Sequence, residues 1–261
     1  MILTAADEVD LIRQAGEITG RVLAHLSEMV APGVTTGQLD RTAEELMRSF
    51  GALPTFKGYR NYPACICTSI NEEVVHGIPS ADRVLKEGDI ISIDLGCTLR
   101  RVVAGSQRDY IGDSAVTVPV GEIAQRTARL IEATRSALYA AVAVCRAGTT
   151  LDTIGGSIED IARAAGLGIV REYGGHGIGY GYHEDPFILN FRSGSRMKLK
   201  PGMVIAIEPM FNLGGDRVRL KPDGWTVVTQ DYKPSVHFEH SLLITEGDPE
   251  ILTKRPNEVI S

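Results

Sequence analysis

The chain contains an internal repeat, and this repeat limits the folds that it can adopt. Residues 85–94, LKEGDIISID, recur 114 positions later as residues 199–208, LKPGMVIAIE. Two further pairs of segments match in the same order: residues 33–35 with 148–150 at an offset of 115, and residues 113–116 with 239–242 at an offset of 126. The unit is longer than a solenoid repeat, so the pattern predicts two pseudo-symmetric halves of one domain.

Apolar periodicity indicates what each half contains. It predicts one helix from a cap at Thr4-x-x-Asp7 to Pro32-Gly33, and a second helix capped by Thr35 or Thr36. In the first half, strands are predicted around residues 64–69 and 89–95. In the second half, two more helices are predicted over about residues 124–144 and 151–165.

These elements predict an α+β fold made of duplicated halves, roughly residues 1–120 and 121–250. The halves should share a curved, mostly antiparallel sheet whose outer face the helices cover. No Gly/Ser-rich or Pro-rich linker separates them, so residues 1–261 are expected to form a single catalytic domain.

Composition excludes several classes of protein. The net charge is -6 and no Lys/Arg cluster occurs, so nucleic acid is not an expected partner. No run approaches the roughly 18 apolar residues of a membrane span, and the N-terminus does not resemble a signal peptide. The spacing of the four cysteines fits neither a zinc ribbon nor a disulfide framework. We therefore expect reduced thiols and a cytoplasmic location.

Two pairs of carboxylates occupy equivalent positions in the repeat. Asp94 and Glu208 each end an apolar strand, and Asp113 and Glu239 form the second pair. Taken alone, each strand-end acid is explained about as well by exposure to solvent as by a role in metal binding. A pseudo-dyad, however, would bring all of them together, and like charges at close range need a cation between them. Four carboxylates plus a histidine are suited to two divalent metal ions.

The chain has six histidines to complete such a site. His176 lies in a glycine-rich run, which fits either a flexible turn or a backbone that approaches a ligand closely. His76 and His183 are further candidates. His25 is expected to be structural or exposed. His237 and His240 flank Glu239, and strand alternation should point both away from the face of Glu239. One of them would contact a ligand residue from behind.

Seven motifs in order resemble type I methionine aminopeptidases. They run from Asn71-Glu72 to Phe238-Glu239-His240, and the likeness covers about residues 11–253: NExxxHGIP (71–79), SID (92–94), GDS (112–114), GHGIG (175–179), HE (183–184), IEPM (207–210) and FEH (238–240). This resemblance implies the duplicated pita-bread fold of that family.

The resemblance also implies a role for individual residues. The metal ligands would be Asp94, Asp113, His176, Glu208 and Glu239, with Asp113 and Glu239 bridging two ions of Co, Mn, Fe or Zn. The residues in contact with the scissile bond would be His76 and His183, and Glu208 would shuttle the proton. The methionine pocket would comprise Tyr59, Tyr62, Cys67, Tyr182 and Trp225, although these residue types are equally typical of an ordinary core.

One departure from the family pattern concerns the bridging carboxylate. Eighteen residues separate Asp94 from Asp113, whereas the family has a tighter hairpin there. The insertion places Asp109 in competition with Asp113. We expect Asp113 to be the ligand, because it fits both the GDS motif and the repeat.

The predicted activity is removal of the N-terminal methionine from nascent polypeptides by metal-hydroxide attack on the peptide carbonyl, with the ribosome as a candidate partner. A small second residue should be preferred, so the bulky Ile2 predicts that the chain keeps its own Met1. A monomer is expected. The alternatives are a proline-directed peptidase of the prolidase or aminopeptidase P kind and a non-catalytic binding module. A type II enzyme is disfavoured, because only 24 residues separate His183 from Glu208.

Overall fold

Four α-helices form where the periodicity predicts them in the structure, a computed structural model that describes residues 2–3, 5–256 and 258. The helices are α1 (Ala6–Met29), α2 (Thr36–Ser49), α3 (Gln125–Val144) and α4 (Leu151–Ala165), and one 3-10 turn, η1, spans Tyr59–Asn61. Met1 and Thr4 lie outside the described residues, so the predicted cap at Thr4 and the fate of Met1 remain predictions.

Side-chain caps explain where two of these helices begin. Thr35 is the N-cap of α2: its hydroxyl accepts a hydrogen bond from Gln38 N at 3.2 Å, and the Gln38 side chain accepts one from Thr35 N at 2.7 Å. Thr150 caps α4 in the same way through Thr153 N. Each cap satisfies an amide that the first turn leaves without a partner.

All of the strand pairs in the described part of the chain are antiparallel, and they form four small sheets. The strands are β1 (Leu53–Pro54), β2 (Cys67–Ile70), β3 (Glu73–Val75), β4 (Ile90–Val103), β5 (Ser106–Pro119), β6 (Gly168–Ile169), β7 (Gly175–Gly177), β8 (Glu184–Ile188), β9 (Val204–Ile207), β10 (Met210–Asn212), β11 (Val218–Leu220), β12 (Val227–Thr229), β13 (Ser235–His237), β14 (His240–Leu243) and β15 (Glu250–Ile251). One sheet carries β4 and β5, and another carries β9, β7 and β14.

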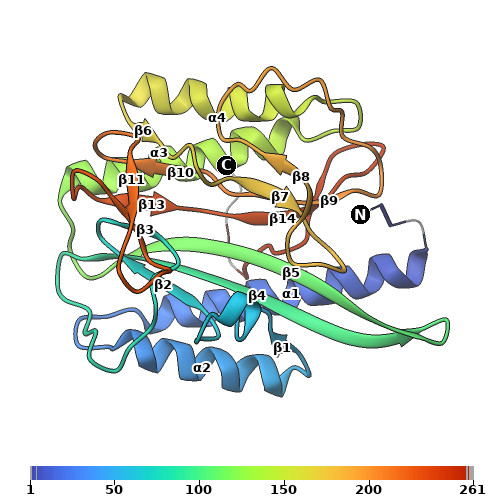
Figure 1. The fold of residues 1–261 in the computed structure, drawn as a ribbon, viewed down its shortest axis with the longest axis horizontal. Coiled ribbons are helices and arrows are strands. Elements are labelled where there is room, and N and C mark those ends of the chain that lie inside the picture. Colours follow the sequence, from blue (N-terminus) through green and yellow to red (C-terminus); the bar gives the residue numbers. More distant parts are fainter. Residues whose placement is uncertain (1, 4, 257, 259–261) are drawn as a thin grey trace.

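The helices lie on two opposite sides of the strands (Figure 1). Helices α1 and α2 cover the side formed by β4 and β5, and α3 and α4 cover the side formed by the second half of the chain. One hydrophobic core joins both halves, with members such as Leu23, Ile93, Leu138 and Leu242. This arrangement confirms the predicted α+β fold of duplicated halves.

The two halves meet along β5. Glu239 N donates to the carbonyl oxygen of Ala115 at 2.9 Å, and Ser241 Oγ donates to that of Asp113 at 2.8 Å. The two segments that the repeat makes equivalent, residues 113–116 and 239–242, are thus bonded to each other across the pseudo-symmetric centre.

The β4–β5 hairpin is longer than predicted. Strand β4 was expected to end near residue 95, but it continues to Val103, and the ladder runs without a break from Ile90 opposite Pro119 to Val103 opposite Ser106. Ala104 and Gly105 close the hairpin with φ of 50° and 78°, the positive values that a tight two-residue turn requires. The inserted residues therefore lengthen a regular ladder, and Figure 1 shows its tip projecting beyond the helices.

Candidate metal centre and active site

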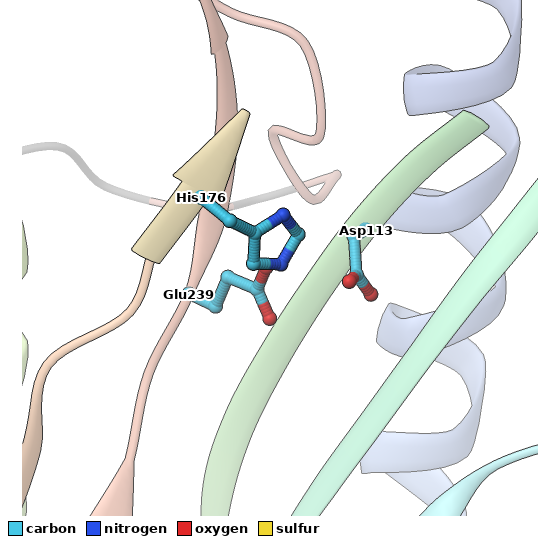
Figure 2. A group of neighbouring side chains, drawn as sticks. All are labelled: Asp113, His176 and Glu239. Atoms are coloured by element: carbon cyan, nitrogen blue, oxygen red, sulfur yellow. The ribbon is translucent and has the colours of Figure 1, made fainter. Parts of the chain in front are cut away.

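Three of the predicted ligands point toward one another at the junction of the two halves (Figure 2). A carboxylate oxygen of Asp113, one of Glu239 and a ring nitrogen of His176 all lie within 4.8 Å of one another, and all three residues are buried. Asp113 lies within β5, His176 within β7, and Glu239 between β13 and β14.

The other two predicted ligands, Asp94 and Glu208, line the same cavity. Glu208 directly follows β9, and its Oε1 lies 3.5 Å from Nε2 of His176. Asp94 lies within β4, where it pairs with Cys67 on one side and Ala115 on the other. The structure thus brings together all five residues at which the resemblance places a metal.

Close packing behind β5 fixes the position of Asp113. A Cβ atom at the preceding Gly112 would lie 2.8 Å from the Cα of Gly16 on α1, so neither position has space for a larger residue. The backbones of α1 and β5 therefore approach directly. Because Gly112 faces the helix, alternation turns Asp113 to the opposite face of the strand, toward the cavity.

The carboxyl groups are buried without enough partners of their own. Asp94 Oδ1, Asp113 Oδ1 and Glu239 Oε1 have no hydrogen-bond partner among the described residues. Burial raises the pKa of Asp94 to about 7. Burial, together with the charge on Asp113 or Asp94, raises the pKa of Glu208 and Glu239 well above the ordinary range. Such oxygens are stable as anions only beside cations, so the donor set fits divalent metal ions.

His176 has the tautomer that a metal ligand needs. Its Nδ1 lies 2.9 Å from the carbonyl oxygen of Gly177, and a carbonyl can only accept, so Nδ1 carries the proton. The unprotonated Nε2 then faces Glu208 and the other acids. Burial lowers the pKa of His176 to about 4, which keeps the ring neutral at pH 7.

His76 and His183 line the cavity beside the acidic cluster. Tyr59 Oη is hydrogen-bonded to Nδ1 of His183 at 3.0 Å. Burial lowers the pKa of His183 to about 3 and that of His76 to about 4, so both are neutral at pH 7. His76 has a φ of 60°, a strained value for a residue with a side chain, and its ring contacts Trp225 edge-on.

The predicted direction of His237 was wrong. Strand alternation was expected to point it away from the face of Glu239, but it lines the cavity. Its Nε2 lies 3.7 Å from Oε2 of Glu208, which agrees with the expectation that one of the two histidines would contact a predicted ligand residue. The reason is that the strand is interrupted between β13 and β14, so alternation does not continue through Glu239. His240 does turn away, because its ring bonds Thr253 and Glu258.

Two other residues discussed above lie away from the cavity. Both carboxylate oxygens of Asp109 accept hydrogen bonds from Arg100, at 2.7 and 2.8 Å, on the projecting hairpin. His25 is exposed on α1. Asp113 is therefore part of the acidic cluster, and Asp109 is not.

An apolar wall adjoins the acidic cluster. The residues predicted for a methionine pocket all line the cavity, which has a volume of about 750 Å³: Tyr59, Tyr62, Cys67, Tyr182 and Trp225. Phe56 joins them, with its ring centroid 5.0 Å from that of Tyr182. The ring centroids of Tyr62 and Trp225 are also 5.0 Å apart, in an edge-on contact. The wall can bury an unbranched apolar side chain beside the charged cluster.

Several lining residues were not predicted from the sequence: Phe56, Arg60, Val75, Glu172, Tyr173, Gly174, Asp185 and Phe187. They come from loops and short strands without a period of their own. Only their proximity in sequence to Tyr59, His76, His176 and His183 could have suggested them. The four cysteines are free thiols, as predicted, and all are buried.

Comparison with known proteins places this geometry in a family. Residues 10–246 match metallopeptidase family M24. The chain is 46% identical over 255 residues to a methionine aminopeptidase of Clostridium acetobutylicum, covering 97% of this chain and 99% of that protein. The crystal structure of methionine aminopeptidase from Thermotoga maritima superposes with a TM-score of 0.91 at 39% identity, over 98% of this chain and all of that one.

A more distant likeness extends to proline-directed enzymes. The prolidase from Pyrococcus furiosus superposes with a TM-score of 0.74 at 26% identity, covering 98% of this chain but only 66% of that one. Within the described residues, no helix combines the length and apolar character needed to cross a membrane. Sequence match, fold and the buried acidic cluster agree: the chain belongs to metallopeptidase family M24.

Proposed function

We propose that the protein is a methionine aminopeptidase that removes the N-terminal methionine from polypeptides. One observation carries this proposal above the rest: a buried cluster of unpaired carboxylate oxygens adjoins a cavity with an aromatic, apolar wall. The first feature suits a metallopeptidase, and the second suits an unbranched apolar side chain.

Five residues would hold two divalent metal ions: Asp94, Asp113, His176, Glu208 and Glu239. Oxygens of Asp113 and Glu239 lie within 4.8 Å of each other, which supports the bridging role that the resemblance implies for both. When bound, the ions supply Lewis acidity and lower the pKa of water enough for hydrolysis at neutral pH. Carboxylate oxygens with one imidazole accept Mn, Fe, Co or Zn, so the donors do not distinguish these metals.

The protein groups around this site would divide the remaining work. His183, which is neutral and hydrogen-bonded to Tyr59, would donate to the carbonyl oxygen of the scissile bond as negative charge develops there. Glu208 would take a proton from the attacking water and give it to the leaving amine. His76 would contact the peptide on the other side.

The aromatic wall would select methionine. Tyr59, Tyr62, Cys67, Tyr182 and Trp225 would enclose its unbranched side chain, and these rings limit the length and width that can enter. Crowding near His76 and His183 would favour a small second residue. Both preferences concern substrate shape, so they can be measured independently of the metal used.

The experiment that tests the function compares two substrate classes. After removal of metal, the protein is supplied with Mn, Fe, Co or Zn and incubated with Met-Ala-Ser or with an X-Pro dipeptide. Release of free methionine from Met-Ala-Ser, with little cleavage of X-Pro, is the expected result. Faster cleavage of X-Pro would identify a proline-directed peptidase. A chain that binds no divalent metal in titration calorimetry would instead be a binding module.

The setting of this activity is part of the same proposal. We infer that residues 1–261 act as one catalytic domain, as a monomer in the cytoplasm, on nascent chains near the ribosome. The acidic net charge and the lack of a Lys/Arg cluster give no support for a nucleic-acid partner. Sedimentation velocity tests the monomer, and co-sedimentation with translating ribosomes tests the ribosome association.

A further inference from the structure

A buried carboxylate on the first helix accepts hydrogen bonds from side chains of two elements that flank the active site. Glu8 on α1 is buried, with 9% of its surface exposed. Its Oε1 accepts hydrogen bonds from Tyr180 Oη and Arg108 Nη1, each at 2.5 Å, and from Tyr110 Oη at 3.1 Å. Three hydrogen bonds to one anionic oxygen hold these side chains firmly, because hydrogen bonds to a charged group are stronger than those between neutral groups.

The same donors also contact one another. Arg108 Nη1 donates to Tyr180 Oη at 3.0 Å, and its guanidinium carbon lies 5.1 Å from the centroid of the Tyr180 ring. The rings of Tyr110 and Tyr180 meet edge-on, with centroids 5.6 Å apart. A backbone bond from Ile111 N to Gly179 O at 3.0 Å reinforces the contact. Strand β5 is therefore bound to the segment around Tyr180 by side chains and backbone alike.

That segment carries two residues of the proposed active site. Residues 178–183 connect β7 to β8 without regular structure and contain two glycines. Backbone bonds from Ile178 N to Val204 O and from Gly179 N to Gly181 O hold the start of this segment. Tyr182 and His183 at its end line the cavity, whereas none of Glu8, Arg108 and Tyr180 is among the described residues that line it. Tyr180 thus holds the segment from outside while its neighbours face inward.

We propose that Glu8, Arg108 and Tyr180 form a positioning network that holds residues 178–183 so that Tyr182 and His183 face the bound peptide. The network gives the inserted hairpin a role, because Arg108 lies on the lengthened part of β5. This inference rests on the proposed function only in assigning peptide as the ligand. The mechanical link itself is independent of substrate.

The kinetic test removes single groups from the network. Tyr180→Phe deletes one hydroxyl and keeps the ring, and Glu8→Gln keeps the shape but removes the charge. With Met-Ala-Ser, kcat should fall about tenfold and KM should change less than twofold, because misplacing His183 weakens transition-state contacts while most of the methionine wall lies elsewhere. Arg100→Gln is the matched control: it breaks the neighbouring pair with Asp109 on the same hairpin, and kcat should stay within twofold.

A second measurement does not need activity. Hydrogen exchange is followed by mass spectrometry in peptides that span residues 178–183, with Mn affinity measured by calorimetry on the same samples. Exchange in this segment should become about tenfold faster in Tyr180→Phe and Glu8→Gln but not in Arg100→Gln, with Mn affinity within twofold of the parent protein.

The outcomes separate the two proposals. A parent protein that does not cleave Met-Ala-Ser sinks the proposed function, yet faster local exchange in the variants still supports the network. Unchanged exchange in residues 178–183 overturns the network, whatever the activity. Faster exchange across the whole chain, or loss of Mn binding, overturns it as well, because either result means that these residues only stabilise the fold.

Discussion

Asp94 on β4 and Asp113 on β5 lie diagonally across the hairpin ladder on one face, since Asp94 pairs with Ala115 and Asp113 pairs with Gly96. Diagonal neighbours in a ladder are close enough for their side chains to interact. Two buried carboxylates so placed repel each other when both are ionised. The fold therefore maintains an arrangement that is unfavourable in the absence of a cation, and metal binding and stability should be linked.

The first prediction concerns the pH dependence of the metal-free protein. Burial raises the pKa of Asp94 from an ordinary value near 3.8 to about 7, so the folded state holds a proton that the unfolded chain releases. The stability from this group is complete below its unfolded pKa and is lost as pH rises through about 7. Between about pH 5 and 7, each carboxyl of this kind should lower the free energy of unfolding by roughly 1.4 kcal/mol per pH unit.

Urea unfolding of protein treated with chelator measures this slope. Asp94→Asn removes the titrating group, so its slope should be smaller than that of the parent protein. Saturating Mn should reverse the trend, because a bound cation favours the ionised carboxylates. Equal slopes for the parent and Asp94→Asn would show that Asp94 does not titrate in this range.

The second prediction separates the two aspartates of the inserted hairpin. Asp113→Asn should lower Mn affinity roughly 100-fold or more and abolish most activity, because the amide replaces a buried anion in the acidic cluster. Asp109→Asn should change both quantities less than twofold, since Asp109 binds Arg100 on the projecting hairpin. Calorimetry with Mn, together with methionine release, checks both variants. The reverse ranking would make Asp109 the ligand.

Some elements of the fold could be predicted from the sequence and others could not. The periodicity predicted helix 151–165, and α4 spans Leu151–Ala165, because the amphipathic pattern is complete and a threonine cap marks its start. The extension of β4 from residue 96 to Val103 was missed. Its residues become exposed and rich in arginine, so the apolar alternation that marks a buried strand disappears while the ladder continues.

The residues of the candidate site could be predicted for a different reason. Repeat-equivalent acids had to meet if the halves are related by pseudo-symmetry, and the structure brings Asp94, Asp113, Glu208 and Glu239 to one cavity. His237 was misjudged because a local break in strand geometry leaves no trace in composition. Loop residues such as Phe56 were invisible, because only the tertiary fold brings them to the cavity.

The third prediction concerns His183, which we propose to donate to the scissile carbonyl. His183→Ala should lower kcat by about 100-fold, the usual effect of removing one donor to a developing oxyanion. Since burial lowers the pKa of His183 to about 3, its ring stays neutral, and the activity of the parent protein should show no inflection from this group between about pH 6 and 8. Steady-state rates over that range measure both effects.

The control for this prediction is His25→Ala, which removes an exposed imidazole from α1 and should leave kcat within twofold. An equal loss of activity in both variants would mean that the effect is not local to the cavity. Retention of full activity by His183→Ala would remove this residue from the reaction.

The last prediction concerns the aromatic wall. Trp225 contacts the rings of Tyr62 and His76, so Trp225→Ala should open the cavity and remove apolar contact with the methionine side chain. That contact is the same in the ground state and the transition state, so KM for Met-Ala-Ser should rise about tenfold while kcat changes little. Tyr232→Ala removes an exposed aromatic ring outside the cavity and is the matched control. A fall in kcat with constant KM would instead place Trp225 in the positioning of His76.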